Sequence, residues 1–163
     1  MTDHAEATQK MWGMIKGIGF AMLTTEDNGT LRARPMVAAQ DEFDGNLYFF
    51  TRASSHKVQE AGSGDPVGVT YADPGKQDYV SLSGHSTVVR DKATIDAHWQ
   101  ESLRTWFPGG KDDPDIAILK VKVEMAEYWD APNSKMVHAY GYVKSLVTGT
   151  PPDPGENEKL KFA

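Results

Sequence analysis

Apolar residues recur at helical spacing in several segments of this chain. The spacing predicts helices over residues 3–16, 54–61, 92–104 and 133–147. Gly17 and Gly19 follow the first helix and are typical of a helix end. A strand is the alternative for residues 133–147, because β-branched residues are frequent there. We favour a helix for that segment.

Between the helical segments the apolar residues alternate with polar ones, as in half-buried strands. This alternation predicts six strands, over residues 18–25, 30–39, 47–51, 66–71, 77–90 and 116–129. Asp27-Asn28-Gly29 is a strong hairpin turn between the first two strands. Because the second and third strands follow one another across a short turn, we expect them to pair. Gly84 marks a bulge or bend in the fifth strand.

Six strands joined by short turns are typical of an antiparallel sheet that closes on itself. Closure removes exposed sheet edges, so the pattern predicts a mainly β fold, a closed or split barrel with helices that plug or cover it. We expect one domain of 163 residues. Its parts are an N-terminal helix over 1–17, a barrel over 18–130, a C-terminal helix over 131–149 and a loose tail over 150–163.

The composition narrows the function classes. The formal net charge is −6 and no cysteine is present, which argues against broad nucleic-acid binding and excludes thiol chemistry. No apolar run approaches the ~20 residues that cross a bilayer, and the N-terminus is polar. We therefore expect a soluble, cytoplasmic protein with no nucleic-acid or membrane partner.

The segment from Phe50 to Lys57 carries the clearest candidate chemistry. A short apolar strand stops at Thr51, and a helix begins near Ser54 and Ser55, with Lys57 in its first turn. Hydroxyls, backbone N–H groups and an ammonium can converge there on one dianionic group, as in a phosphate site. The alternative is an ordinary strand, a serine N-cap and a solvated lysine.

Two further sets of residues fit beside such a site. Arg32 and Arg34 share one face of the second strand, where they form either a cationic wall or a solvent-facing pair. Trp106 lies in a Pro/Gly loop and Trp129 near a strand end, which suits stacking on a planar ligand, a subunit interface or a satellite cluster. The five histidines are scattered, so we expect no metal site. No side chain stands out as catalytic.

Together these segments resemble the pyridoxamine 5′-phosphate oxidase-like, FMN-binding split-barrel superfamily, and more narrowly its general stress protein 26 branch. The resemblance covers about residues 11–149. It is carried by Arg32-Ala33-Arg34-Pro35-Met36, Phe50-Thr51, Ser55-His56-Lys57, Tyr79-Val80-Ser81-Leu82-Ser83-Gly84, the loop from Trp106 to Pro114, and Glu127-Tyr128-Trp129-Asp130.

The resemblance implies a six-stranded split barrel that forms a homodimer, with flavin at the subunit interface. It implies that Thr51, Ser55 and Lys57 hold the FMN phosphate, as the chemistry of the segment suggests. We expect Thr51, Ser54 and Ser55 to donate hydrogen bonds to that phosphate, with Phe50 beside them. It also implies that the ring lies along Arg34-Pro35-Met36 and that an arginine, Arg32 or Arg34, helps at the phosphate. Trp106 and Trp129 would reach the flavin from the other subunit. FAD or a deazaflavin is the alternative cofactor.

The chain also departs from true pyridoxamine 5′-phosphate oxidases. Tyr79 stands where they carry a glutamine, and no arginine follows Arg104, whereas they end in an arginine-rich motif that holds the substrate phosphate. We therefore expect no such oxidase activity. The resemblance favours a flavin-dependent oxidoreductase with a nicotinamide donor. The alternatives are a flavin carrier without turnover and a barrel that binds no flavin.

Overall fold

The protein is described by a computed structural model covering residues 3–61, 63–131, 135–151 and 155–162. Its helices and strands follow in the order α1 (His4–Ile18), β1 (Phe20–Asp27), β2 (Thr30–Val37), β3 (Asn46–Arg52), α2 (His56–Ala61), β4 (Ser63–Asp73), β5 (Asp78–Val89), α3 (Lys92–His98), η1 (Glu101–Thr105), η2 (Gly110–Asp112), β6 (Ile116–Asp130), α4 (Lys135–Thr148) and β7 (Glu156–Lys161).

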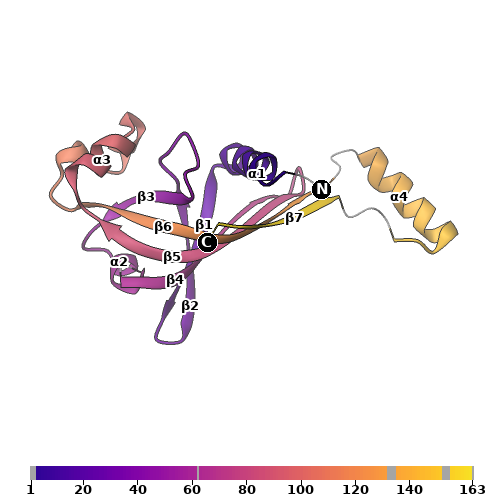
Figure 1. Ribbon diagram of the computed structural model, residues 1–163, viewed down its shortest axis with the longest axis horizontal. Helices are drawn as coiled ribbons and strands as arrows, with labels where there is room; N and C mark the ends of the chain where they lie inside the picture. Colours follow the sequence, from indigo (N-terminus) through magenta and orange to yellow (C-terminus); the bar gives the residue numbers. More distant parts are fainter. Residues whose placement is uncertain (1–2, 62, 132–134, 152–154, 163) are drawn as a thin grey trace.

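A single curled antiparallel sheet forms the body of the molecule (Figure 1). Its strands run in the order β2-β1-β4-β5-β6-β3, and β7 pairs with the second half of β6. The predicted mainly β split barrel is confirmed. The expectation of a loose tail is wrong over β7, where Leu160 is buried in the core and holds the strand in place.

The predicted pairing of the second and third strands is wrong. β2 pairs along its length with β1, and β3 pairs with β6, so the two lie at opposite ends of the strand order. They meet only just beyond β2, where Ala38 forms an isolated bridge with Phe49. This bridge brings the two ends of the sheet together, so sequence neighbours close the barrel rather than form a hairpin.

Local turn chemistry accounts for several element boundaries. Asn28 and Gly29 both have positive φ (51° and 81°), as the two-residue hairpin between β1 and β2 requires. The carboxylate of Asp91 accepts a hydrogen bond from the Thr94 N–H at 2.8 Å and caps α3. That helix ends at His98 rather than at residue 104, and a separate 3₁₀ turn follows.

The core fills the inside of the curled sheet and is covered by α1. Alternate residues of each strand point inward, and α1 places Met11, Trp12 and Ile15 against them. A second apolar cluster joins Phe50 of β3 to Ile95 of α3 and to Phe107. Among the described residues no helix is long and apolar enough to span a membrane.

Helix α4 confirms the helix predicted over 133–147, although residues 133 and 134 lie outside the described residues. It does not cover the barrel as expected. Figure 1 shows α4 standing off one end of the sheet, with α3 at the opposite end. The exposed side chains of Leu146 and Val147 are consistent with that position.

We expect Gly84→Ala to destabilise the fold. β5 shifts register against β6 between Ser83 and Gly84, and a Cβ on Gly84 would lie 1.9 Å from the backbone oxygen of Lys122. Overpacking of this kind costs about 1–3 kcal/mol of unfolding free energy, measured by chemical denaturation. Gly13→Ala is the matched control, since its Cβ meets nothing within 4 Å inside α1. Equal stabilities of the two variants would contradict the close approach.

Candidate functional site

A pair of positive charges lies where β2 meets α2. The Lys57 ammonium lies 3.4 Å from the sulfur of the buried Met36. Arg34, two positions before Met36 on β2, donates to the Thr25 hydroxyl of β1 at 2.7 Å. α2 packs beside β4 and β1, which brings its lysine to this edge of the sheet. We call Arg34 and Lys57 the cationic pair.

A pair of hydroxyls lies just before α2 in the chain. The Thr51 and Ser55 oxygens are 3.2 Å apart, within hydrogen-bond distance. Thr51 is buried at the end of β3, and Ser55 belongs to the turn that leads into α2. Because Ser55 precedes Lys57 by two residues, the hydroxyl pair and the cationic pair share one end of the barrel.

Ser54 is oriented differently from its neighbour. Its hydroxyl donates to the Asp115 carboxylate at 2.7 Å, and its backbone N–H donates to the same carboxylate at 3.0 Å. Those contacts and the positive charge of Arg52 hold the pKa of Asp115 below its usual range, with the Ser54 hydroxyl contributing most. The predicted site serine therefore ties the turn to the loop before β6.

The environment of Lys57 indicates what this end of the barrel can bind. The pKa of its ammonium is lowered first by burial and then by the positive charge of Arg34. Burial removes water from the charge, and the neighbouring guanidinium repels it. An anion placed between the two would replace the lost solvation and relieve the repulsion. The residues present therefore fit a phosphate-like group.

The remaining predicted site residues lie in varied environments. Arg32 is exposed and lies 3.9 Å from the Asp27 carboxylate, while Pro35 is an exposed residue of β2. The Phe50 side chain is buried against Trp99 and Phe107, so only its backbone remains for a ligand. Trp106 is exposed, and its carbonyl accepts a hydrogen bond from Arg52 at 3.3 Å.

Trp129 is separated from the cationic pair within one chain. Tyr128, its neighbour on β6, lies four strand spacings, or about 19 Å, across the sheet from β2. The side chain of Trp129 also points to the opposite face from the buried Tyr128. The structure thus joins Arg34, Met36, Thr51, Ser55 and Lys57 at one end of the barrel and leaves Trp129 outside.

Two contacts of the site were missed from the sequence. Thr25 accepts the Arg34 hydrogen bond, and Asp115 holds Ser54. Neighbouring residues of β1 point to opposite faces of the sheet, which could have indicated that Thr25 faces inward with Ala21 and Leu23. The contact between Asp115 and Ser54 could not be predicted from local sequence, because the two residues lie 61 positions apart.

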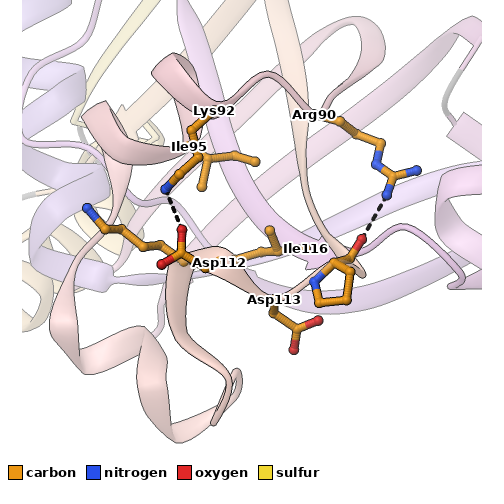
Figure 2. A pocket seen from close by; sticks show the side chains of 8 residues that line it. Arg90, Lys92, Ile95, Asp112, Asp113 and Ile116 are labelled. Atoms are coloured by element: carbon orange, nitrogen blue, oxygen red, sulfur yellow. Dashed lines mark hydrogen bonds and ion pairs between the residues drawn. The ribbon is translucent and has the colours of Figure 1, made fainter.

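Two shallow hollows lie outside this site. One, of about 220 Å³, is lined mainly by charged residues. Figure 2 shows Lys92 reaching Asp112 (2.8 Å) and Arg90 reaching the carbonyl of Pro114 (2.9 Å). The other, of about 460 Å³, lies beside Tyr48 and His98, whose rings stack with centroids 3.9 Å apart. Neither of these two hollows contains a predicted site residue.

The curled antiparallel sheet and its covering helices define a protein of the split-barrel class, as predicted from the sequence. The chain belongs to the pyridoxamine 5′-phosphate oxidase like family, whose model matches residues 6–153. General stress protein 26 of Bacillus subtilis is 28% identical over 75% of this chain and 87% of its own length.

Solved structures agree with this membership. A general stress protein 26 from Jannaschia sp. CCS1 has a TM-score of 0.77 at 26% identity, covering 97% of this chain and 99% of its own. A general stress FMN/FAD binding protein from Xanthomonas citri has a TM-score of 0.69 at 30% identity, covering 80% of this chain and 92% of its own. The predicted family and its general stress protein 26 branch are confirmed.

We expect Lys57→Met to stabilise the ligand-free protein. The substitution removes a half-buried charge that Arg34 repels. In the wild type the folded pKa of Lys57 lies below the ordinary 10.5. At a pH between the folded pKa of Lys57 and 10.5, the lysine is protonated in the unfolded chain and largely neutral in the folded one. The stability of the wild type should therefore rise as the pH rises through this range.

Thermal unfolding at a series of alkaline pH values measures this effect. The alkaline gain should be smaller in Lys57→Met, and inorganic phosphate at matched ionic strength should raise the melting temperature of the wild type more than that of the variant. Identical pH and phosphate responses would show that Lys57 is an ordinary solvated lysine.

Proposed function

We propose that the protein is a flavin-binding protein that holds FMN through its phosphate at the Arg34–Lys57 end of the barrel. The observation that carries the proposal is the half-buried Lys57 ammonium, whose pKa is lowered by burial and then by the neighbouring Arg34. The hydroxyl pair of Thr51 and Ser55 lies at the adjoining turn. Two neighbouring positive charges of this kind repel each other without a ligand and are stabilised by a bound dianion.

Each residue has a distinct part in holding the phosphate. Lys57 and Arg34 neutralise its charge, and Arg34 is kept in place by its hydrogen bond to Thr25. Thr51 and Ser55 donate hydrogen bonds once their mutual contact opens. Ser54 is left out of this set, because Asp115 already accepts its hydroxyl. One phosphoryl group satisfies these donors, which favours FMN over FAD.

The ring of the cofactor would lie along β2, beside the backbone of Pro35 and Met36. A bound flavin supplies the redox chemistry, and the protein supplies binding and orientation. Support for a flavin comes from the Xanthomonas citri relative, described as a general stress FMN/FAD binding protein. A deazaflavin has the same phosphate tail and remains the alternative.

A second copy of the chain would complete the site. Trp129 on β6 is separated from β2 by β1, β4 and β5 along the sheet, which suits contact with the cationic pair of a partner. Trp106 is 71% exposed, which suits a side chain that stacks on a ligand held by another subunit. We therefore place the flavin between the subunits of a homodimer in the cytoplasm.

The function we favour is a flavin-dependent oxidoreductase, with a non-catalytic flavin carrier as the alternative. Oxidation of pyridoxamine 5′-phosphate is not proposed, because no arginine follows Arg104 to hold a second phosphate. Anaerobic mixing of the flavin-loaded protein with NADH or NADPH separates the two functions. Bleaching of the flavin absorbance at a catalytic rate supports the oxidoreductase, and its absence with both donors supports the carrier.

We expect Lys57→Ala and Arg34→Ala each to weaken FMN binding. Loss of a charge-assisted hydrogen bond costs about 1.5–3 kcal/mol, or roughly ten- to a hundredfold in Kd. Titration of the flavin-stripped protein, followed by flavin fluorescence, gives the Kd. Lys16→Ala, an exposed lysine at the end of α1, serves as the charge control.

Ser55→Ala and Ser54→Ala form a matched pair. Ser55 donates to the phosphate in our proposal, so its loss should raise the FMN Kd roughly tenfold. Ser54 is engaged with Asp115, so its loss should leave the Kd nearly unchanged while lowering stability slightly. A larger rise of the FMN Kd in Ser54→Ala than in Ser55→Ala would contradict this assignment of the phosphate site.

A further inference from the structure

Helix α4 belongs to an arm that leaves the barrel between two paired strands. Asp130, the last residue of β6, pairs directly with Glu156, the first residue of β7. The chain between them makes α4 and returns. We call this excursion, residues 131–155, the arm, and Asp130 with Glu156 its root.

The root of the arm is held by several contacts. The Lys10 ammonium of α1 lies 2.8 Å from the Asp130 carboxylate and also pairs with Glu156. The Tyr128 hydroxyl donates to Glu156 at 3.1 Å. Gly155 has a φ of +85°, and a Cβ there would lie 2.4 Å from the Asp130 carbonyl oxygen. These contacts hold the ends of β6 and β7 together, and Figure 1 shows α4 away from the sheet.

The described part of α4 carries an uncovered apolar stripe. Tyr142 and Leu146 are 65% and 69% exposed, and Val143 and Val147 are 58% and 81% exposed. Residues four apart lie on the same side of a helix, so these two pairs form one continuous strip along the axis. Within the described residues no strand or helix packs against this strip as a layer.

A matching apolar row crosses the outer face of the sheet. Val37 pairs with Phe20 on β2 and β1, and Tyr79 pairs with Trp129 on β5 and β6. The β1–β4 register sets Phe20 level with Ala72, which lies opposite Tyr79. Each residue of the row is next in sequence to a buried residue, and neighbours along a strand point to opposite faces of the sheet. The row therefore faces outward. We call it the outer row.

We infer that α4 of one copy packs its apolar stripe on the outer row of a second copy. This inference rests on the homodimer of the proposed function and states how that dimer is held together. The 14 residues of α4 are about 21 Å long. The outer row crosses five strands, or about 19 Å. The helix is thus as long as the row, and the stripe over residues 142–147, about 9 Å of it, covers roughly half of the row.

The available area agrees with a stable dimer. The exposed apolar side chains of the stripe and the outer face include four aromatic residues, and an aromatic side chain buries ~150–250 Å². These four residues are 37–66% exposed, so they leave roughly 300–500 Å² per copy. The exposed aliphatic residues add to this area, and a typical stable interface takes about 800 Å² per partner.

Symmetry favours a second copy over another protein. Every chain carries both the stripe and the row, so a two-fold axis covers two stripes with two rows and leaves neither exposed. α4 lies away from its own sheet (Figure 1), which favours exchange between copies over folding back.

Glutamate substitutions in the stripe test this inference. Leu146→Glu and Val147→Glu place charges in the proposed interface, and each dimer contains two copies of the change. We expect the dimer Kd to rise at least about a hundredfold by sedimentation equilibrium. Lys144→Glu, at an exposed polar position of the same helix, should leave the Kd within about threefold. A monomeric wild type, or dimers unaffected by both stripe variants, would overturn the inference.

A cross-link locates the contact, because the chain contains no cysteine of its own. The Val147→Cys variant, labelled on its single thiol with a benzophenone maleimide, is irradiated in a mixture of ¹⁴N- and ¹⁵N-labelled protein. Mixed-isotope products joining the labelled position of α4 to peptides of β1, β2 or β5 support exchange of the arm. Products confined to single chains show that the arm folds back and overturn it.

Flavin content is read on the same preparations and separates the two proposals. If the wild type is a dimer without flavin and Val147→Glu dissociates it, the packing of α4 on a second copy is supported and the flavin-binding function is contradicted. If the wild type is a monomer that retains flavin, the packing of α4 on a second copy and the homodimer are contradicted, while the phosphate site is supported.

Discussion

The structure depends on a change of partner in the middle of β6. Up to Lys122 this strand pairs with β3, and from Met125 it pairs with β7, while β5 runs along its other edge throughout. The register shift against β5 falls at the same point, with Glu124 as the extra residue. Gly84 opposite the bulge has no side chain, so the Lys122 carbonyl can approach it. A bulge bends its strand and increases the twist. That bend lets one sheet curl far enough for Ala38 and Phe49 to meet.

The two halves created by this bend serve different purposes. The first half of β6 pairs with β3, which ends at Thr51 and leads through Ser55 to Lys57. The second half pairs with β7 and carries the root of the arm. The anion site and the arm therefore lie at opposite ends of one strand.

The cationic pair illustrates a conflict between stability and binding. A half-buried ammonium next to a guanidinium weakens the folded state, and its lowered pKa reflects that strain. Such an arrangement is consistent with a ligand that supplies the missing negative charge. Contacts elsewhere in the chain hold the pair in place: Thr25 accepts a hydrogen bond from Arg34, and the Met36 sulfur lies against Lys57. Asp115 fixes the nearby turn through Ser54 rather than approaching the lysine.

The sequence by itself determined the features that depend on residues close in the chain. Helical and strand periods located α1, α4 and the six barrel strands, Asn28-Gly29 specified the first hairpin, and the serines and lysine after Thr51 indicated an anion site. Only the tertiary structure decided which strands pair, that Ser54 serves Asp115, that β7 completes the sheet, and that α4 stands away from the barrel. Each of these depends on partners many positions apart, such as Ser54 and Asp115. Local periodicity shows which face of an element is apolar, but the element that covers that face is chosen by the packing of the whole chain.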